Sequence, residues 1–156
     1  MSYYNWFCLI QKDSSVNKEY PKTFVRGLSS IDYIQDGKVL PIAFQFKEMG
    51  RDDGMAESSI NWVDDYDAIE LALKQRKDNG KIQFQAGLAE LDLERVKLFL
   101  ESFSNDDFSY ERRPLENNPY HGNLLVNHSL KKQMKALIAN GLALAAGSNI
   151  IPQTYN

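Results

Sequence analysis

Apolar residues alternate with polar ones along two segments of the chain, which is the spacing of a strand buried on one face. The residues that share these faces are Leu40, Ile42, Phe44 and Phe46 in the first segment, and Ile82, Phe84, Ala86 and Leu88 in the second. Pro41 indicates an edge strand or a bulge in the first segment. Shorter apolar runs predict further strands at residues 23–28, 58–63, 108–112 and 124–126.

Three other segments carry apolar residues at helical spacing. Their apolar faces contain Val63, Tyr66, Ile69 and Leu73; Leu93, Val96, Leu100 and Phe103; and Leu130, Met134, Leu137, Ile138 and Gly141. The predicted N-caps, whose side chains would accept hydrogen bonds from the first turn, are Asp64 or Asp65, Asp92 and Ser129. The first helix is predicted to end at Asn79 and Gly80, and the third at Gly147. A single helical turn is predicted at residues 31–35, capped by Ser29 or Ser30 and stopped by Gly37.

These elements predict an α+β fold, in which one layer of helices packs on a mostly antiparallel sheet. We expect about five strands and three helices, with the longest helix at the C-terminus. The chain has 156 residues, a usual length for one domain. We divide it into an N-terminal arm or strand at residues 1–20, an α+β domain at residues 21–147 and a C-terminal tail at residues 148–156.

Charge and cysteine content narrow the classes of function. The net charge of −3 and the pI near 5.4 argue against a nucleic-acid partner, because nonspecific binding to DNA or RNA needs a basic surface. Cys8 is the single cysteine, so no intramolecular disulfide can form. The sequence begins without the pattern of a signal peptide, and its longest apolar-rich stretch, residues 136–151, is shorter than the ~20 residues of a membrane span. We therefore expect a cytoplasmic protein with no membrane partner.

The sequence motifs of several enzyme classes are absent. The chain has no phosphate-binding G-x-x-x-x-G-K-[ST] loop, no G-x-G-x-x-G and no G-x-S-x-G nucleophile elbow. Cys8 lies in an apolar run, which is typical of a buried and unreactive thiol. Two histidines and one cysteine without ligand spacing do not make a zinc site.

An acidic group at Asp64, Asp65 and Asp67 has two explanations. One or two carboxylates with water can hold Mg²⁺. Carboxylates also gather in the first turn of a helix, where they complement its dipole. We favour the second explanation and predict neither a metal nor a cofactor.

A compact basic patch at the start of the last predicted helix consists of His128, Lys131, Lys132 and Lys135. Lysines in a first turn oppose the helix dipole, and residues placed against local preference are sometimes contact residues. A solvated charged face is the plainer explanation. If the patch binds, the acidic face of a protein partner fits it best, ahead of RNA.

The segment at residues 117–123 has the composition of a turn that presents side chains. Pro119 forces Asn118 out of the helical region, and Gly122 permits a tight turn around Tyr120 and His121. His121 can act as an acid or base near neutral pH, since an imidazole has an unperturbed pKa of about 6.5. The alternative is a polar turn whose side chains bond only to nearby backbone.

Several short pieces occur in an order that resembles a family of small bacterial proteins of uncharacterised activity. The pieces are Arg26; Asp36, Gly37 and Val39; Ala43 and Phe44; Ser59, Asn61 and Trp62; and Asn118, Pro119 and His121. The resemblance spans residues 26–126. It implies an accessory protein near bacterial defence or regulatory systems.

A second resemblance is to ADP-ribosyltransferases of the Arg–Ser–Glu type. Arg26, then Ser58 and Ser59, then Glu111 or Glu116 follow the order of that family, in which an arginine holds NAD and a late glutamate is catalytic. The chain has Ser-Ser-Ile where the family has Ser-Thr-Ser. No Glu-x-Glu or Gln-x-Glu occurs late in the chain.

The leading hypothesis is an accessory protein that docks on another protein, as a subunit of a defence or regulatory complex. The alternatives are an NAD-using transferase or acid–base enzyme built around Arg26 and His121, and a nucleic-acid accessory that uses the basic patch. The enzyme hypothesis predicts that Arg26 and His121 meet in one pocket. The candidate binding residues are Arg26, Asn61, Trp62, Asn118, Tyr120, His121, Lys131, Lys132 and Lys135.

Overall fold

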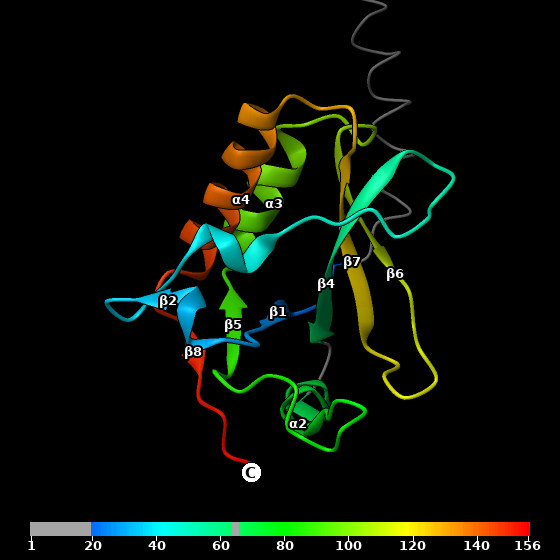
Figure 1. Ribbon diagram of the computed structural model, residues 1–156. Coiled ribbons are helices and arrows are strands. Elements are labelled where there is room, and N and C mark those ends of the chain that lie inside the picture. The colour runs from blue at the N-terminus through cyan, green and yellow to red at the C-terminus, as the bar shows by residue number, and fades with distance from the viewer. Residues whose placement is uncertain (1–19, 64–65) are drawn as a thin grey trace, which may run out of the picture.

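The computed structural model describes residues 20–63 and 66–156 (Figure 1). Its main sheet has six strands in the order β6-β7-β4-β1-β5-β8, and each neighbouring pair is antiparallel. The strands are β1 (Thr23–Gly27), β4 (Met55–Val63), β5 (Leu88–Leu91), β6 (Phe108–Arg112), β7 (His121–Asn127) and β8 (Ile150–Ile151). A separate hairpin pairs β2 (Ile34–Gln35) with β3 (Lys38–Val39). The predicted α+β class with a mostly antiparallel sheet is confirmed.

The described residues form three α-helices and two short 3₁₀ helices. They are α2 (Tyr66–Lys74), α3 (Leu93–Glu101), α4 (Lys132–Ala146), η1 (Ile31–Tyr33) and η2 (Pro41–Phe44). Helix α4 is the longest and lies near the C-terminus, as expected. None of these helices is long and apolar enough to cross a bilayer. In Figure 1, α3 and α4 lie together, whereas α2 lies at the other end of the domain.

Each face of the sheet has its own core. Side chains alternate along a strand, so Phe24 in β1 points to one face and Val25 to the other. Phe24 joins a large buried cluster with residues from α3, α4 and η2. Val25 joins a smaller cluster with Ala68 and Ala72 of α2. The sheet is therefore covered by helices on both faces, so the expectation of one layer of helices is wrong.

The sheet opens between β1 and β4. These strands pair only where Thr23–Val25 lies opposite Asn61–Val63, and β1 then continues along β5 as far as Gly27. Further along β4, Glu57 pairs instead with Lys47, through two backbone hydrogen bonds of 2.9 Å. The result is a split between β4 with its neighbours β7 and β6, and β1 with its neighbours β5 and β8.

Local caps are placed as the sequence predicts at three helix ends. The Ser30 side chain accepts a hydrogen bond from Asp32 N (3.1 Å) at the start of η1. Asp92 accepts one from Arg95 N (3.1 Å) at the start of α3. Gly147 ends α4 with φ +55°, a left-handed conformation that glycine adopts most readily.

The two strands predicted from alternation are largely wrong. Residues 41–44 form the 3₁₀ helix η2, because Pro41 has a fixed φ and no N–H to donate to a ladder. Its Ala43 and Phe44 pack against α4 instead. In the second segment only Leu88 enters a strand, since Gly87 has φ +94° immediately before it.

Two helix boundaries also differ from the predictions. Ser129 does not cap α4; Lys131 is the N-cap and its side chain makes no capping hydrogen bond. Helix α2 ends at Lys74, before the predicted stop at residues 79–80. The predicted caps Asp64 and Asp65, residues 1–19 of the predicted arm at residues 1–20, and Cys8 lie outside the described residues. Residues 148–156, expected as a tail, contain β8, which pairs with β5.

Candidate functional site

A cavity of about 500 Å³ occupies the split between β1 and β4. Its walls come from β1, β4, the segment at residues 45–49, α2 with residues 83–84, and the tip of the β6–β7 hairpin. The polar and charged residues that line it are Arg26, Ser29, Tyr33, Gln45, Lys47, Glu57, Ser58, Asn61, Gln75, Gln83, Asn117, Asn118 and His121. The split thus gathers hydrogen-bonding side chains from several elements around one cavity.

Arg26 extends from β1 toward the face that α3 and α4 cover. Its partner in β5 is Ala89, which belongs to the larger core cluster. The Arg26 Nε donates to the carbonyl oxygen of Ala43 in η2 at 2.8 Å, and this bond orients the guanidinium group. Burial lowers the pKa of Arg26 from its ordinary value, because the protein replaces much of the water around its charge.

Ser58 and Asn61 supply two buried polar groups in β4. The two residues are 2% and 7% exposed, and both line the cavity. Ser58 Oγ and Asn61 Nδ2 have no hydrogen-bond partner among the residues that the structure describes. Buried polar atoms are nearly always paired, so two unpartnered atoms in one cavity wall call for an explanation.

The orientation of the Asn61 amide is set by Asn118. Asn118 is 1% exposed, and its Nδ2 donates to Asn61 Oδ1 at 2.9 Å. The Asn118 Oδ1 accepts a hydrogen bond from Tyr120 N at 3.2 Å, in a turn of the type that asparagine favours. The amide contact uses the oxygen of Asn61 and leaves its NH₂ group as the unused donor. The predicted turn falls earlier than expected, since Gly122 lies within β7.

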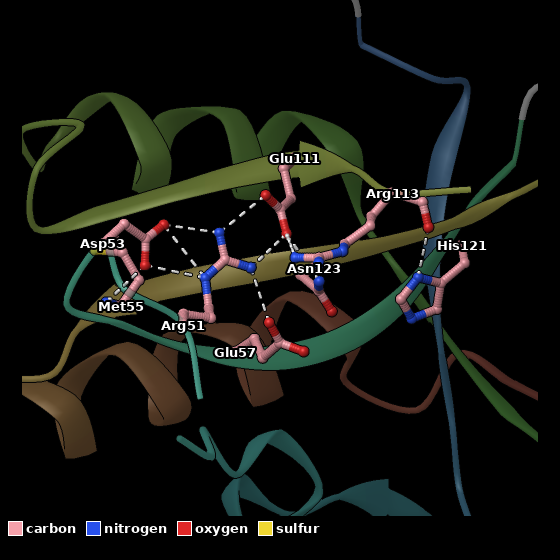
Figure 2. Close-up of polar contacts among 8 residues, drawn as sticks. All are labelled: Arg51, Asp53, Met55, Glu57, Glu111, Arg113, His121 and Asn123. Carbon is pink, nitrogen blue, oxygen red and sulfur yellow. Dashed lines mark hydrogen bonds and ion pairs between the residues drawn. The ribbon is translucent and has the colours of Figure 1, made fainter. Parts of the chain in front are cut away.

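His121, at the start of β7, also lines the cavity. Its Nδ1 lies 2.9 Å from the carbonyl oxygen of Arg113 (Figure 2). A carbonyl oxygen only accepts hydrogen bonds, so Nδ1 carries the proton in the neutral ring. The Nε2 atom of that tautomer holds a lone pair and can accept a proton or a hydrogen bond.

A charged cluster beside the cavity consists of Arg51, Asp53, Glu57 and Glu111, and we name it the Arg51 cluster (Figure 2). The guanidinium group lies 2.8 Å from oxygens of both Asp53 and Glu57, and 2.7 Å from Glu111 Oε2. Asn123 Nδ2 donates to the same Glu111 oxygen at 2.9 Å. The hydrogen bonds from Arg51 lower the pKa of Glu111 and bring the pKa of Asp53 down to about 2.

The Arg51 cluster ties the segment at residues 47–54 to β4 and β6. Gly50 and Gly54 have φ near +72° and +78°, which allows this segment to reverse direction. Lys47, Met49 and Glu57 belong to both the tied region and the cavity wall. Sequence reasoning missed this cluster, because Arg51 and Glu111 are 60 positions apart.

The residues predicted for binding do not all lie at one place. Arg26, Asn61, Asn118 and His121 all line the cavity, so Arg26 and His121 do share one pocket. Tyr120 packs instead against the cluster beneath α2. The backbone of Trp62 lies in β4, and its side chain is outside the description.

The basic patch is at the start of α4, and none of its residues lines the cavity. Lys131 and Lys132 are exposed, and Lys135 Nζ donates to the carbonyl oxygen of His128 at 2.6 Å. His128 Nε2 lies 3.3 Å from Glu48 Oε1. The patch thus contacts the backbone of the loop that precedes α4, and its histidine contacts Glu48 of a different segment.

No group of three metal-ligating side chains occurs within residues 20–63 and 66–156. Asp67, one member of the acidic group, stands in the first turn of α2, where a carboxylate complements the helix dipole. Comparison with protein-family models, curated proteins and solved structures finds no match to this chain. The assignment of a function therefore rests on the cavity and its contacts.

Proposed function

We propose that the protein binds a small polar molecule in the cavity between β1 and β4. The observation that carries this proposal is the pair of buried, unpartnered groups in its wall, Ser58 Oγ and Asn61 Nδ2. The volume of about 500 Å³ falls within the usual range of ligand pockets, roughly 300–1,000 Å³. A ligand with hydrogen-bond acceptors would complete both groups.

Leaving a buried polar group without a hydrogen-bond partner has a free-energy cost. A buried donor or acceptor without a partner costs about 1–3 kcal/mol of folding free energy. Ser58 and Asn61 both line the cavity and each keeps one such group, so the free protein accepts that cost twice in one wall. Binding residues commonly carry such a cost, because function and stability favour different side chains at the same position.

Replacing Ser58 with alanine separates these two roles. We expect Ser58→Ala to raise the free energy of unfolding by about 1 kcal/mol, because it removes a buried hydroxyl group that has no hydrogen-bond partner. Ligand affinity should fall by about fivefold, the value of one hydrogen bond. Urea denaturation measures the stability, and ligand-observed NMR with a panel of small carboxylates, phosphate esters, amides and sugars measures the binding.

Ser104→Ala is the matched control, since Ser104 is exposed and does not line the cavity. This control should change neither stability nor binding. The proposal is wrong if the unmodified protein binds no member of the panel, or if Ser58→Ala binds the panel as tightly as the unmodified protein.

Binding is proposed in preference to ADP-ribosyl transfer because of where the carboxylates lie. Arg26 and Ser58 line the cavity together, as a transferase would require. Glu111 is held in the Arg51 cluster, and Glu116 is exposed in the hairpin loop. Neither of these glutamates is among the described residues that line the cavity.

Docking on a partner protein is the second candidate function, favoured by exposed leucines on α3 and α4. Leu98 and Leu144 are both 69% exposed, and Leu137 is 51% exposed. Affinity purification from the native host with a Lys131→Glu/Lys132→Glu variant tests this candidate. A stoichiometric partner lost with the variant supports docking, whereas recovery of the protein alone contradicts it. Membership of a bacterial defence or regulatory complex stays a prediction.

A further inference from the structure

We propose that the cavity binds a neutral ligand through an amide edge, that is, a carbonyl oxygen and an N–H group on the same side of the molecule. Lactams, primary amides and nucleobases share this chemistry. The inference rests on the proposed binding function and names its ligand class. It follows from a hydrogen-bond donor at Asn61, an acceptor at His121 and the way in which Asn118 holds both residues.

The donor is the Asn61 NH₂ group, and a chain of contacts that begins at the backbone sets its orientation. Tyr120 N can only donate, so the Asn118 side-chain atom 3.2 Å from it is the oxygen. The Asn118 NH₂ group therefore faces Asn61, whose oxygen accepts at 2.9 Å. Asn61 is 7% exposed and lines the cavity, and its own NH₂ has no partner among the described residues.

The acceptor is the Nε2 atom of His121. The carbonyl oxygen of Arg113, 2.9 Å from Nδ1, can only accept, so Nε2 keeps the lone pair of the neutral ring (Figure 2). His121 lines the same cavity. Its backbone N–H donates to the carbonyl oxygen of Asn118 at 3.2 Å. Asn118 thus contacts Asn61 through its side chain and His121 through its main chain.

The donor and the acceptor stand at neighbouring positions. Asn61 and His121 lie directly opposite each other in the pairing of β4 with β7. Side chains at such positions share one face of the sheet, with Cβ atoms about 4.5–5.5 Å apart. In a lactam, a primary amide or a nucleobase, the carbonyl oxygen and an N–H point the same way. In an open-chain secondary amide they point in opposite directions, because the trans form is favoured.

The rest of the cavity wall suits a ring with one polar edge. Asn61 also lies opposite Val25, which lines the cavity together with Ala72, Leu88 and Phe84 of the same core cluster. Uncharged hydrogen-bonding groups beside an apolar surface are typical of sites for small neutral ligands. Side-chain amides are the most numerous polar groups among the described lining residues, namely Gln45, Asn61, Gln75, Gln83, Asn117 and Asn118.

Two probes that differ only at the amide nitrogen test the acceptor. The first, 2-piperidone, carries a carbonyl and an N–H on one edge, whereas 1-methyl-2-piperidone keeps the carbonyl and lacks the N–H. Protein-observed NMR titration in the millimolar range measures both affinities. We expect 2-piperidone to bind about fivefold more tightly, the value of one hydrogen bond. Equal affinity for the two probes overturns the inference.

His121→Asn separates a lost hydrogen bond from crowding by the methyl group. Asparagine keeps a donor near the position of Nδ1 and has no acceptor at the position of Nε2. In this variant the two probes should bind equally, because 2-piperidone loses a partner and 1-methyl-2-piperidone does not. A preference that persists comes from crowding and overturns the inference. His128→Asn is the matched control; His128 does not line the cavity, and this variant should keep the preference.

Asn61→Asp tests the donor. Aspartate keeps the oxygen that accepts from Asn118 and replaces the NH₂ group with a second oxygen. Both probes should therefore bind about fivefold more weakly or worse, because each carbonyl loses its donor. Unchanged affinity in this variant overturns the inference. Asn140→Asp adds the same charge at an exposed position of α4 that does not line the cavity, and it should leave both affinities unchanged. If Asn61→Asp does not fold, the probe pair and His121→Asn still decide the question.

Further probes distinguish the sources of the amide edge. Uracil represents nucleobases, benzamide represents primary amides and 2-piperidone represents lactams, and the tightest of the three identifies the source. N-ethylpropanamide matches 2-piperidone in carbon number but has the trans geometry of an open chain. It should bind about fivefold more weakly than 2-piperidone, since it can use only one of the two groups at a time. Equal affinity overturns the same-side geometry and with it the inference.

The outcomes also separate this inference from the proposed function. Binding of carboxylates, phosphate esters or sugars without binding of any amide overturns the amide edge and leaves small-molecule binding in place. Binding of no probe at all overturns both.

Discussion

Gly141 in α4 makes room for the aromatic ring of Phe99 in α3. A Cβ atom built on Gly141 would lie 2.4 Å from Phe99 Cζ, much closer than van der Waals contact. The ring cannot move aside easily, because it also packs edge-on against Phe103 and Phe108, with centroid distances of 5.3 and 5.8 Å. The close approach of the two helices therefore depends on the absence of one methyl group.

Gly141→Ala is expected to destabilise the protein by about 2 kcal/mol, because the added methyl group overpacks the contact with Phe99 and forces this ring off its preferred rotamer. This loss should occur although alanine favours a helix over glycine by about 1 kcal/mol. Asn140→Ala on the exposed side of α4 is the control and should be neutral or slightly stabilising. Thermal unfolding of both variants makes the comparison, and a stabilised Gly141→Ala would contradict the packing argument.

Single residues of the candidate site were predictable where the local sequence marks them. Asn118 and His121 stand around a proline in a turn, and Arg26 interrupts an apolar strand. Arg51 has no such mark, because its role depends on Glu111, which only the folded sheet brings within 2.7 Å. The sequence also cannot show that Ser58 Oγ lacks a hydrogen-bond partner, because this depends on all the residues that surround it in the fold.

At the scale of elements, the Arg51 cluster fixes a loop that has little apolar contact of its own. Met49 is 62% exposed, so the segment at residues 47–54 has little apolar burial to hold it in place. Its attachment comes from the backbone pairing of Lys47 with Glu57 and from the ion pairs of Arg51. These contacts also position one wall of the cavity.

Arg51→Gln should destabilise the protein by about 2 kcal/mol at neutral pH, because Glu57 and Glu111 lose a charged hydrogen-bond donor. The pKa of Glu111 is lowered in the folded state and that of Asp53 falls from 3.8 to about 2, so their stabilisation is present above about pH 4. It is lost as the pH falls toward 2. Urea denaturation between pH 2 and 7 should therefore show a flatter acid limb for Arg51→Gln.

Lys38→Gln removes an exposed cation of β3 and serves as the control for charge alone. An acid limb that is equally steep in Arg51→Gln and in the unmodified protein would show that these carboxylates gain no stability from Arg51.

Elements were predicted well where one local interaction decides them. The Asp92 side chain accepts a hydrogen bond from Arg95 N, three residues ahead. This capping preference can be predicted without tertiary information. The alternation at residues 40–46 predicted a strand, and this prediction is wrong. Pro41 starts a 3₁₀ helix there, from which Phe44 packs on α4. Helix α4 begins at Lys132 without a capping side chain, so no local cap of this kind marks its start.

At the scale of the whole molecule, the sheet consists of two parts joined by three residue pairs. Thr23–Val25 and Asn61–Val63 form that junction, and the cavity occupies the open remainder. Hydrophobic patterning predicted a helix-covered antiparallel sheet. It could not predict the split, because patterning shows which residues are buried but not which strand each one pairs with.

Amide hydrogen exchange should reveal these two parts as separate units of protection. We expect β4, β6 and β7 to share one opening free energy, and β1, β5 and β8 to share another, with the edge strand β8 exchanging fastest. Addition of a ligand that binds in the cavity should slow exchange in both units together. A single uniform protection across the sheet, unchanged by ligand, would contradict the division.

The narrow junction has a consequence for the lifetime of the protein in a cell. A ligand in the split contacts both parts of the sheet, so it favours the closed, folded form by an amount that grows with its concentration. Proteases act on transiently opened chains, and small changes in their population alter abundance several-fold. The supply of the ligand would then set how much of the protein survives, so turnover itself would report on that small molecule.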